Sequence, residues 1–448
     1  MGSLDTVFKA YDIRGTVPDQ LDTSVARAVG AAFARFSEAE RVIVARDMRE
    51  SGPALVSAFS EGVTSAGADV VDLGMASTDL LYFAAGRLNS PAAMFTASHN
   101  PAVYNGIKLC LAGARPVGED SGLAEIKALA EAGPADGAGA APGSVSSADL
   151  LDDYARHVRT FVDTSVPRPL RVVADTANGM GGLVVPRVFE GLPFELDILF
   201  PELDGSFPNH PADPINPENL KDLQARVLDS EADIGLAFDG DADRVFLVDE
   251  QAVPISGSVT TAIVAKSVLA KHPGATIIHN LICSRVVPEV ILENGGVPKR
   301  TRVGHSFIKA VMADTGAVFG GEHSGHYYFR DNYRADSGLI AALMVLEQLS
   351  LGDQLLSELR KPFERYSNSG EINVEVADTD AVIDRVAAAF PEGTHDRTDG
   401  LTVDLGDWWF NLRPSNTEPV LRINVEAPTP AACEEHTGRL VELVKQGA

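Results

Sequence analysis

The chain has 448 residues, of which 45% are hydrophobic, and a formal net charge of −26. Because a single hydrophobic core rarely serves more than about 250 to 300 residues, this length predicts several domains. The acidic balance and the lack of an apolar run of about 20 residues exclude nucleic acid and membranes as expected partners, and three widely spaced cysteines favour a reducing compartment, so we expect a cytoplasmic protein.

Three segments share one pattern, a β-branched run with a polar, turn-forming end and a helix-like stretch after it. They are RVIVARDMRESG from Arg41, RVVADTANGMGG from Arg171 and ATIIHNLICSR from Ala275. Their separation, on the order of 100 to 130 residues, is that of ordinary domains. The repetition predicts three related α/β domains in tandem.

Composition predicts the breaks between these units. Residues 131–149 are rich in Gly, Ala, Pro and Ser and are interpreted as a linker, with further breaks near residues 250–257 and 365–370. After the third break, four strand-like runs and one helical run predict a smaller C-terminal α+β domain. The expected domains cover residues 1–148, 149–252, 253–366 and 367–448.

The stretch AAMFTASHNP predicts a strand over Ala92–Phe95 and then a loop that carries Ser98 and His99. Ligand sites in open α/β sheets lie at this end of a strand. A serine hydroxyl is a weak nucleophile unless a neighbour activates it or it already carries a transferable group. The alternative interpretation is that Ser98 and Asn100 only cap a turn.

The stretch AFDGDADRVFLVDE places Asp239, Asp241 and Asp243 at alternate positions. An extended loop would direct all three carboxylates to one side, and such hard oxygen ligands suit Mg²⁺. A calcium-binding EF-hand loop is disfavoured because Arg244 replaces the required glycine and both flanks are strand-like. A solvated acidic turn is the remaining alternative.

Two further loops carry polar groups. FGGEHSGHYYF places Glu322, Ser324 and His326 around glycines, which allows close approach to a sugar and hydrogen bonds to its hydroxyls, and His305 in RVGHSFIK has a pKa range suited to proton transfer. WWFNLRPSNTEP offers phosphate donors, with a guanidinium for a bidentate grip. These donors are Arg413, Ser415, Asn416 and Thr417. The alternatives are a glycine-rich turn, a structural histidine and a polar strand connection.

Together, TASHNP, DGDADR, GEHSGH and RPSNTEP, with FKAYDIRG near the start, resemble the α-D-phosphohexomutase family, most closely bacterial phosphomannomutase/phosphoglucomutase. The motifs run from Phe8 to Pro419 in the order found in the family. The resemblance implies four domains around a central cleft, with one loop from each domain. It also implies an intramolecular phosphotransferase that interconverts hexose 1-phosphate and hexose 6-phosphate, with mannose or glucose as the sugar.

The resemblance implies a role for each motif residue. Ser98 corresponds to a phosphoserine, and it would share the metal with Asp239, Asp241 and Asp243, beside Arg244. Glu322 and Ser324 would contact sugar hydroxyls, while Arg413, Ser415, Asn416 and Thr417 would hold the phosphate that is not reacting. The residues expected around the reaction centre are Tyr11, Arg14, Lys108 and His305, of which Arg14, Lys108 and His305 are candidates for proton transfer or charge stabilisation.

Phosphoryl transfer depends on positioning and charge neutralisation, so a metal and basic side chains around Ser98 suit the reaction. The phosphorylated enzyme would form a hexose 1,6-bisphosphate that turns over before it returns a phosphate to Ser98. Because an anionic sugar must enter an acidic protein, we expect a locally positive lining. It would include Arg14, Lys108, Arg244, Arg285, Lys299 and Arg413, and Arg285, His99 and His326 are also expected to bind substrate.

Other functions remain open at this point. A metal-dependent phosphatase would also use a serine beside carboxylates, although it has less need for two loops that hold both ends of a substrate. A catalytically silent sugar-phosphate sensor is a third possibility. Within the family, the residue after the glutamate of the sugar loop differs between subgroups. His323 at this position resembles the mannose and glucose enzymes, because the glucosamine enzymes tend to carry glutamine there. The oligomer is expected to be a monomer or a homodimer.

Overall fold

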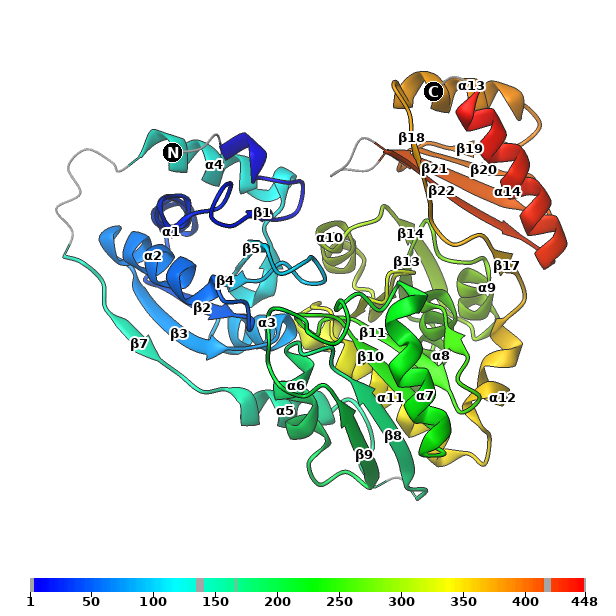
Figure 1. The fold of residues 1–448 in the computed structure, drawn as a ribbon, viewed down its shortest axis with the longest axis horizontal. Helices are drawn as coiled ribbons and strands as arrows, with labels where there is room; N and C mark the ends of the chain where they lie inside the picture. Colours follow the sequence, from blue (N-terminus) through cyan, green and yellow to red (C-terminus); the bar gives the residue numbers. More distant parts are fainter. Residues whose placement is uncertain (1–3, 134–140, 166, 415–419, 447–448) are drawn as a thin grey trace.

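The structure is a computed structural model that describes residues 4–133, 141–165, 167–414 and 420–446. Its four β-sheets follow one another along the chain, and each packs with its own helices (Figure 1). We call the parts domains I to IV, for the ranges 1–148, 149–252, 253–366 and 367–448. The predicted fold class, three α/β domains and a smaller α+β domain, is confirmed.

Domain I is a sheet in the order β1-β5-β4-β2-β3-β7, with β6 paired to β5. Its strands are β1 Ile13–Thr16, β2 Arg41–Arg46, β3 Asp69–Met75, β4 Ala92–Phe95, β5 Tyr104–Leu111, β6 Arg115–Pro116 and β7 Val145–Ser147. Its helices are α1 Thr23–Ser37, α2 Gly52–Ser65, α3 Thr78–Arg87 and α4 Leu123–Ala132. Along β2, Val42 and Val44 join one core cluster while Ile43 and Ala45 join another, which explains a β-branched run without alternation.

The interpretation of residues 131–149 as a linker needs a correction, because β7 lies within that segment. This strand pairs in parallel with β3 at the edge of the sheet, with Val145 opposite Val70. All three β7 residues are exposed, so the strand has no hydrophobic pattern that a sequence analysis could detect. Its pairing covers backbone groups that β3 would otherwise leave open.

Domains II and III each have three neighbouring parallel strands, which continue at one side into antiparallel pairing with two more strands in domain II and one more in domain III. Domain II contains β8 Leu170–Asp175, β9 Phe194–Leu199, β10 Ile234–Phe238 and β11 Val245–Asp249, with α5 Leu151–Arg159, α6 Gly181–Phe189 and α7 Lys221–Asp229. Its sheet also includes β12 Pro254–Ile255, which pairs with β11 although it follows the predicted boundary at residue 252. Domain III contains β13 Thr276–Asn280, β14 Val297–Thr301, β15 Phe319–Gly321 and β16 Tyr327–Phe329, with α8 Gly257–Lys271, α9 Val286–Glu293, α10 His305–Thr315, α11 Gly338–Leu351 and α12 Leu356–Arg360. The three segments that shared a sequence pattern are therefore strands β2, β8 and β13, each followed by a helix.

Domain IV is an antiparallel sheet with its own hydrophobic core, and it lies at the opposite end of the molecule from domain I (Figure 1). Its strands are β17 Ser367–Asn368, β18 Ile372–Glu375, β19 Thr394–Asp396, β20 Leu401–Asp404, β21 Trp409–Pro414 and β22 Val420–Ala427. Helices α13 Thr379–Ala389 and α14 Pro430–Lys445 pack with it.

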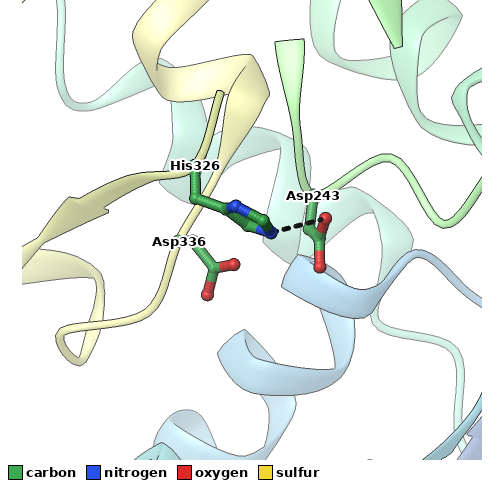
Figure 2. A group of neighbouring side chains, drawn as sticks. All are labelled: Asp243, His326 and Asp336. Atoms are coloured by element: carbon green, nitrogen blue, oxygen red, sulfur yellow. Dashed lines mark ion pairs between the residues drawn. The ribbon is translucent and has the colours of Figure 1, made fainter. Parts of the chain in front are cut away.

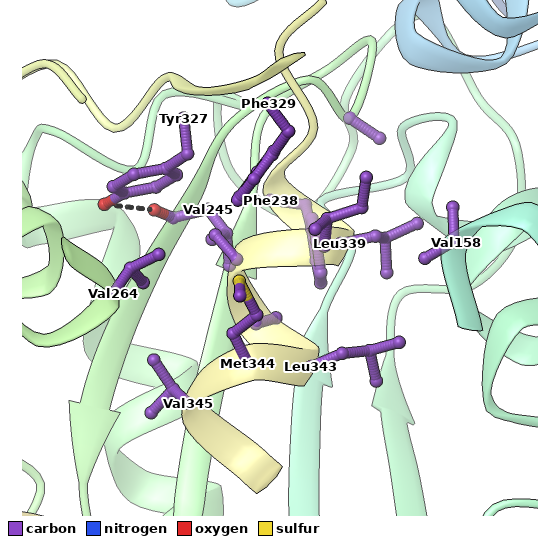
Figure 3. Close-up of a cluster of buried hydrophobic side chains, with 14 of the residues drawn as sticks. Val158, Phe238, Val245, Val264, Tyr327, Phe329, Leu339, Leu343, Met344 and Val345 are labelled. Atoms are coloured by element: carbon purple, nitrogen blue, oxygen red, sulfur yellow. Dashed lines mark hydrogen bonds between the residues drawn. The ribbon is translucent and has the colours of Figure 1, made fainter. Parts of the chain in front are cut away.

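Helix α11 joins domains II and III because both pack on it. Apolar side chains from α5, β10, β11, α8 and β16 surround it (Figure 3). The labelled members are Val158, Phe238, Val245, Val264, Tyr327, Phe329, Leu339, Leu343, Met344 and Val345. Among the described residues, no single helix is long and apolar enough to cross a membrane, and α11 passes that test only as a bent pair with the segment Leu356–Phe363.

A buried carboxylate marks the junction of the first three domains. Asp79, at the start of α3, accepts hydrogen bonds from Ser77 of its own domain, from Tyr154 of α5, and from Ser337 before α11, the last at 2.9 Å. Burial raises the pKa of Asp79 to about 7, against the opposing effect of these three hydroxyl donors. The carboxyl group is therefore partly protonated near neutral pH.

Replacing Leu343 by alanine should destabilise domains II and III together. The Leu343 side chain is 1% exposed in the shared cluster, and its truncation should cost about 2 to 5 kcal/mol. Leu351→Ala is the matched control, because this leucine ends the same helix and is 63% exposed. Urea unfolding followed by circular dichroism checks the prediction, and equal midpoints for the two variants would contradict it.

The pKa of Asp79 predicts a pH-dependent stability that Asp79→Asn should remove. Since the folded state binds this proton up to about pH 7 and the unfolded chain releases it near 3.8, stability falls as pH rises between these values. The contribution is roughly 1.4 kcal/mol per pH unit. Urea unfolding at several pH values should show the asparagine variant gaining on the parent as pH rises. A constant difference between the two proteins would refute the assignment.

Candidate active site

The Ser98 loop follows β4, at the carboxyl end of the strand as predicted. Ser98 is buried and adopts a left-handed backbone conformation with φ 50°, and its N–H donates to Thr96 Oγ1 at 2.9 Å. Its hydroxyl donates to Asp239 Oδ2 at 2.6 Å and accepts from Arg244 Nη2 at 2.9 Å. The structure thus places the predicted nucleophile directly on the predicted metal loop.

The acidic loop lies between β10 and β11 in domain II. Asp239, Asp241 and Asp243 are buried, and each offers an oxygen within 4.8 Å of the others. Asp241 Oδ1 and Asp243 Oδ1 have no hydrogen-bond partner among the described residues. Three hard oxygen ligands, two of them buried and unsatisfied, fit a divalent cation.

A glycine allows this loop to approach Ser98. A Cβ on Gly240 would lie 2.4 Å from the Ser98 carbonyl oxygen, so no larger residue fits without displacing one of the two loops. On the other side, Thr78 of domain I donates its hydroxyl to Asp241 Oδ2 at 2.6 Å, and its N–H donates to the Asp241 carbonyl at 3.0 Å. The contact between domains I and II is therefore part of the site itself.

Basic side chains compensate the buried acids. Lys108 of β5 donates to Asp241 Oδ2 at 2.8 Å and to Asp243 Oδ2 at 2.9 Å. Burial would lower the pKa of Lys108, but these two carboxylates hold it well above its ordinary value. Burial would likewise raise the pKa of Asp241, but Lys108 holds it below the ordinary value. The ammonium and the carboxylate therefore both stay charged.

Asp239 behaves differently from its neighbour. Burial raises its pKa to about 7, Arg244 opposes the shift, and the charges of Asp243 and Asp241 reinforce it. Arg244 donates its Nε to Asp239 Oδ2 at 2.9 Å, so the same guanidinium bridges Asp239 and Ser98. A bound dication would favour the ionised form of Asp239.

The N-terminal basic residue and the histidine of the Ser98 loop also lie at this centre. Arg14 donates to Asn100 Oδ1 at 2.6 Å and pairs with Asp12 at 2.5 Å. His99 Nδ1 lies 2.5 Å from Arg244 Nη2. Burial, and then the charges of Arg244 and Arg14, hold the pKa of His99 well below its ordinary value, so this imidazole is neutral.

The predicted sugar loop follows β15 in domain III. Glu322 accepts from Ser324 Oγ at 3.3 Å, from Tyr328 OH at 3.2 Å and from the Gly304 N–H at 3.2 Å. Burial would raise the pKa of Glu322, but the hydrogen bond and charge of His326 keep it lowered. Glu322 is thus an ionised acceptor with fixed orientation.

His326 links this loop to the acidic loop (Figure 2). Its Nε2 lies 3.7 Å from Asp243 Oδ1, and its Nδ1 lies 3.4 Å from Glu322 Oε2. Burial would lower the pKa of His326, but Glu322 and Asp243 raise it above the ordinary value. Behind it, Asp336 pairs with buried Lys309 at 2.9 Å, and that ammonium also lies 3.6 Å from the Tyr82 ring of domain I.

His305 begins α10 and faces Tyr11, with ring centroids 5.8 Å apart. Tyr11 OH donates to the Val303 carbonyl at 3.2 Å, which ties domain I to domain III. Burial and the charge of Lys309 lower the pKa of His305 to about 3. This histidine is therefore a neutral imidazole at physiological pH.

The residues predicted in domain IV are only partly covered. Arg413 is buried on β21 with its guanidinium 3.5 Å from Glu371, while Ser415, Asn416 and Thr417 lie outside the described residues. Arg285 donates to Asp404 at 2.6 Å and to the Gly406 carbonyl at 2.6 Å, so its guanidinium bridges domains III and IV. Substrate binding by Arg285 would require these contacts to change.

Sequence reasoning missed Thr78, Lys309 and Asp336. Thr78 and Asp336 lie in no motif with a polar pattern of its own, and Lys309 ends the stretch RVGHSFIK, in which only His305 was a candidate. For Thr78 a weak signal existed, because Ser77 caps the helix after a strand that is parallel to β2. For the Lys309–Asp336 pair the sequence offered none.

Family models of phosphoglucomutase/phosphomannomutase match the chain in four parts. The models of α/β/α domains I, II and III match residues 5–135, 152–252 and 256–366, and the C-terminal domain model matches residues 371–443. These matches confirm the resemblance that the motifs predicted.

Individual relatives agree with these matches. A phosphomannomutase from Salmonella montevideo is 41% identical over 434 residues, which are 94% of this chain and 95% of that protein. A phosphomannomutase/phosphoglucomutase from Pseudomonas aeruginosa is 38% identical over 95% of this chain and 92% of its own. A crystal structure of a phosphoglucomutase/phosphomannomutase family protein from Burkholderia thailandensis has a TM-score of 0.89 and 35% identity, and the match covers 99% of this chain and 98% of that one. The chain therefore belongs to the phosphoglucomutase/phosphomannomutase family of hexose phosphate mutases.

Proposed function

We propose that this protein interconverts hexose 1-phosphate and hexose 6-phosphate. Phosphorylated Ser98 would transfer its phosphoryl group to the sugar and then accept the other phosphoryl group back. One observation carries the proposal: the Ser98 hydroxyl lies 2.6 Å from Asp239 of the acidic loop and 2.9 Å from the Arg244 guanidinium. A phosphoryl group on this oxygen would meet positive charge on one side and the metal loop on the other. Phosphoryl transfer is accelerated chiefly by such positioning and neutralisation.

Asp239, Asp241 and Asp243 are proposed to hold Mg²⁺ together with the phosphate on Ser98. When bound, the ion supplies charge neutralisation for the transferring oxygens. The two unsatisfied carboxylate oxygens of Asp241 and Asp243 support this assignment. Arg244 would orient the seryl oxygen and balance its charge as the phosphoryl group leaves.

The protonation states divide the roles of the surrounding groups. Lys108 is locked in its charged form by Asp241 and Asp243, so it suits charge stabilisation better than proton removal. His305 is neutral, but its pKa of about 3 makes it a weak base, so it suits hydrogen bonding better than removal of the proton from the attacking sugar hydroxyl. Arg14 would contribute positive charge near Asn100.

The remaining loops would hold the sugar while its two ends exchange. Ionised Glu322, with Ser324 beside it, is proposed to accept and donate hydrogen bonds to sugar hydroxyls. Arg413, with Ser415, Asn416 and Thr417, would bind the phosphate that is not reacting. A hexose 1,6-bisphosphate could then turn over between a fixed phosphate site and Ser98, which explains why a mutase needs both ends held.

Mannose and glucose phosphates are the proposed substrates. The named relatives include phosphomannomutases and a phosphomannomutase/phosphoglucomutase, which supports this class. His323 follows Glu322 in the loop, and its Nδ1 lies 3.0 Å from the Ser258 hydroxyl of α8. Its side chain is therefore held against α8 and would shape the sugar loop from behind.

Ser98→Ala should abolish phosphoryl transfer without unfolding the protein. Incubation with a hexose 1,6-bisphosphate should add one phosphoryl group to the parent, seen by intact mass, and none to the variant, and kcat should fall at least about 1,000-fold. Ser65→Ala is the control, because that hydroxyl donates to the Gly62 carbonyl of its own helix. A phosphorylated Ser98→Ala protein would place the nucleophile elsewhere, and release of inorganic phosphate without isomerised sugar would indicate a phosphatase.

A comparison of mannose, glucose and glucosamine 1-phosphates tests the sugar assignment. We expect kcat/KM for the mannose and glucose compounds to exceed that for the glucosamine compound at least tenfold, which corresponds to about 1.4 kcal/mol. Formation of the 6-phosphate is measured with a coupled enzyme for each sugar. A preference for glucosamine 1-phosphate would make this protein a phosphoglucosamine mutase.

A further inference from the structure

Arg49 lies in the loop between β2 and α2, beside the Ser98 loop, and its side chain is 1% exposed. Its Nε donates to Asp47 Oδ2 at 3.0 Å. Its two terminal nitrogens donate to four backbone carbonyls, which belong to Ser98 at 2.8 Å, Asn100 at 2.7 Å, Pro101 at 2.9 Å and Tyr104 at 2.9 Å. All five N–H groups of the guanidinium are thus used.

These four carbonyls belong to one turn, which begins at the Ser98 carbonyl itself. The turn is strained at its start, since a left-handed φ of 50° is unfavourable for a serine and persists only where the surroundings impose it. We propose that Arg49 is a positioning residue that holds this turn, and so aims the Ser98 hydroxyl at Asp239. The inference rests on the proposed role of Ser98.

The turn also has side-chain and backbone restraints of its own. The Ser98 N–H donates to Thr96 Oγ1 at 2.9 Å, and Arg14 donates to Asn100 Oδ1 at 2.6 Å. Backbone bonds run from the Asn100 N–H to the Ala97 carbonyl, from the Tyr104 N–H to the Pro101 carbonyl and from the Val17 N–H to the Val103 carbonyl. Each of these bonds involves one peptide group of the turn or one of its side chains. Arg49 alone among these contacts gathers carbonyls from both ends of the turn, at Ser98 and at Tyr104.

Domain II closes over Arg49. The Phe207 ring centroid lies 5.3 Å from the Arg49 Cζ, and a Cβ on Gly205 would lie 2.7 Å from the Arg49 Cα. A second domain II glycine, Gly240, covers the Ser98 carbonyl that Arg49 binds. Domain II, which carries the acidic loop, therefore also packs against Arg49, the residue that holds the Ser98 turn. The acidic loop and the Ser98 turn are thus both positioned by contacts with domain II.

Only an arginine can make this set of contacts. Its planar guanidinium directs five donors in fixed directions, whereas a lysine ammonium offers three donors from one point. Arg49→Lys keeps a positive charge beside buried Asp47 but cannot reach four carbonyls. The substitution therefore loosens the turn and leaves the charge balance intact.

The test compares Arg49→Lys with Arg35→Lys. Arg35 is the matched control, because it also donates to backbone carbonyls in domain I, those of Ala31 and Leu129. We expect kcat of Arg49→Lys to fall on the order of 100-fold, as for a misplacement of about 1 Å, with KM changed far less. Assays run well below the melting temperature of each variant, so a loss of stability alone leaves kcat unchanged.

Backbone hydrogen exchange gives a second readout, which does not depend on Ser98 chemistry. The backbone amides of residues 98–100 and 102–104 should exchange faster in Arg49→Lys than in the parent, and at parental rates in Arg35→Lys. Unchanged exchange with unchanged kcat would overturn the inference, as would equal effects in the two lysine variants. The two proposals can fail separately. If Arg49→Lys exchanges faster but Ser98→Ala still accepts a phosphoryl group, Arg49 positions the turn and Ser98 is not the nucleophile.

Asp47→Asn keeps the inference testable if Arg49→Lys does not fold. Asp47 accepts from the Arg49 Nε and, at 3.0 Å, from the Arg49 N–H, so the neutral amide weakens the anchor while Arg49 remains. A smaller fall in kcat and faster exchange at residues 98–104 are expected. Parental values for both measurements would overturn the inference.

Discussion

The site depends on three carboxylates held within 4.8 Å of one another in a buried loop. Like charges so close together destabilise the fold unless positive charge compensates them. The chain supplies Lys108 on Asp241 and Asp243, and Arg244 on Asp239. One oxygen each of Asp241 and Asp243 has no hydrogen-bond partner within the described part of the chain, and the three acids form a group that could hold a metal ion. The basic groups that surround Ser98 are thus fixed by the acids, so the proposed metal site and the proposed phosphoryl site share the same side chains.

The repeated α/β architecture explains why groups from three domains meet at this point. The Ser98 loop, the acidic loop and the predicted sugar loop each follow the carboxyl end of a sheet strand, which is the edge where ligand sites form in α/β sheets. Helix α11 and the Asp79 junction bind domains I to III to one another. A mutase needs this arrangement more than a hydrolase does, because both ends of the same substrate must be held at fixed positions.

The sequence predicted the parts of the site that are local and left out those that depend on packing between domains. The loops of Ser98, Asp239 and Glu322 each combine a strand, a turn and polar residues within about ten positions, which period and turn rules can detect. Strand β7 was not predicted, because all its residues are exposed and show no hydrophobic pattern. The roles of Lys309 and Arg49 were not predicted, because their partners are remote in sequence. For Arg49 the partners are mainly backbone carbonyls, which every residue type has.

Buried ion pairs are weak evidence for stability, because desolvation often cancels the attraction between the charges. Yet Arg49, Lys108, Arg244 and Lys309 all form such pairs around one loop system. Hydrophobic residues of similar size could fill the same volume at little cost in folding energy, so stability does not account for the cluster. The geometry of the site accounts for the cluster. Charged groups with fixed hydrogen-bond directions impose one orientation on Ser98 and its neighbours, which an apolar core cannot do. The overall charge of −26 says nothing of this, because what matters is which acids are buried and which basic group each of them meets.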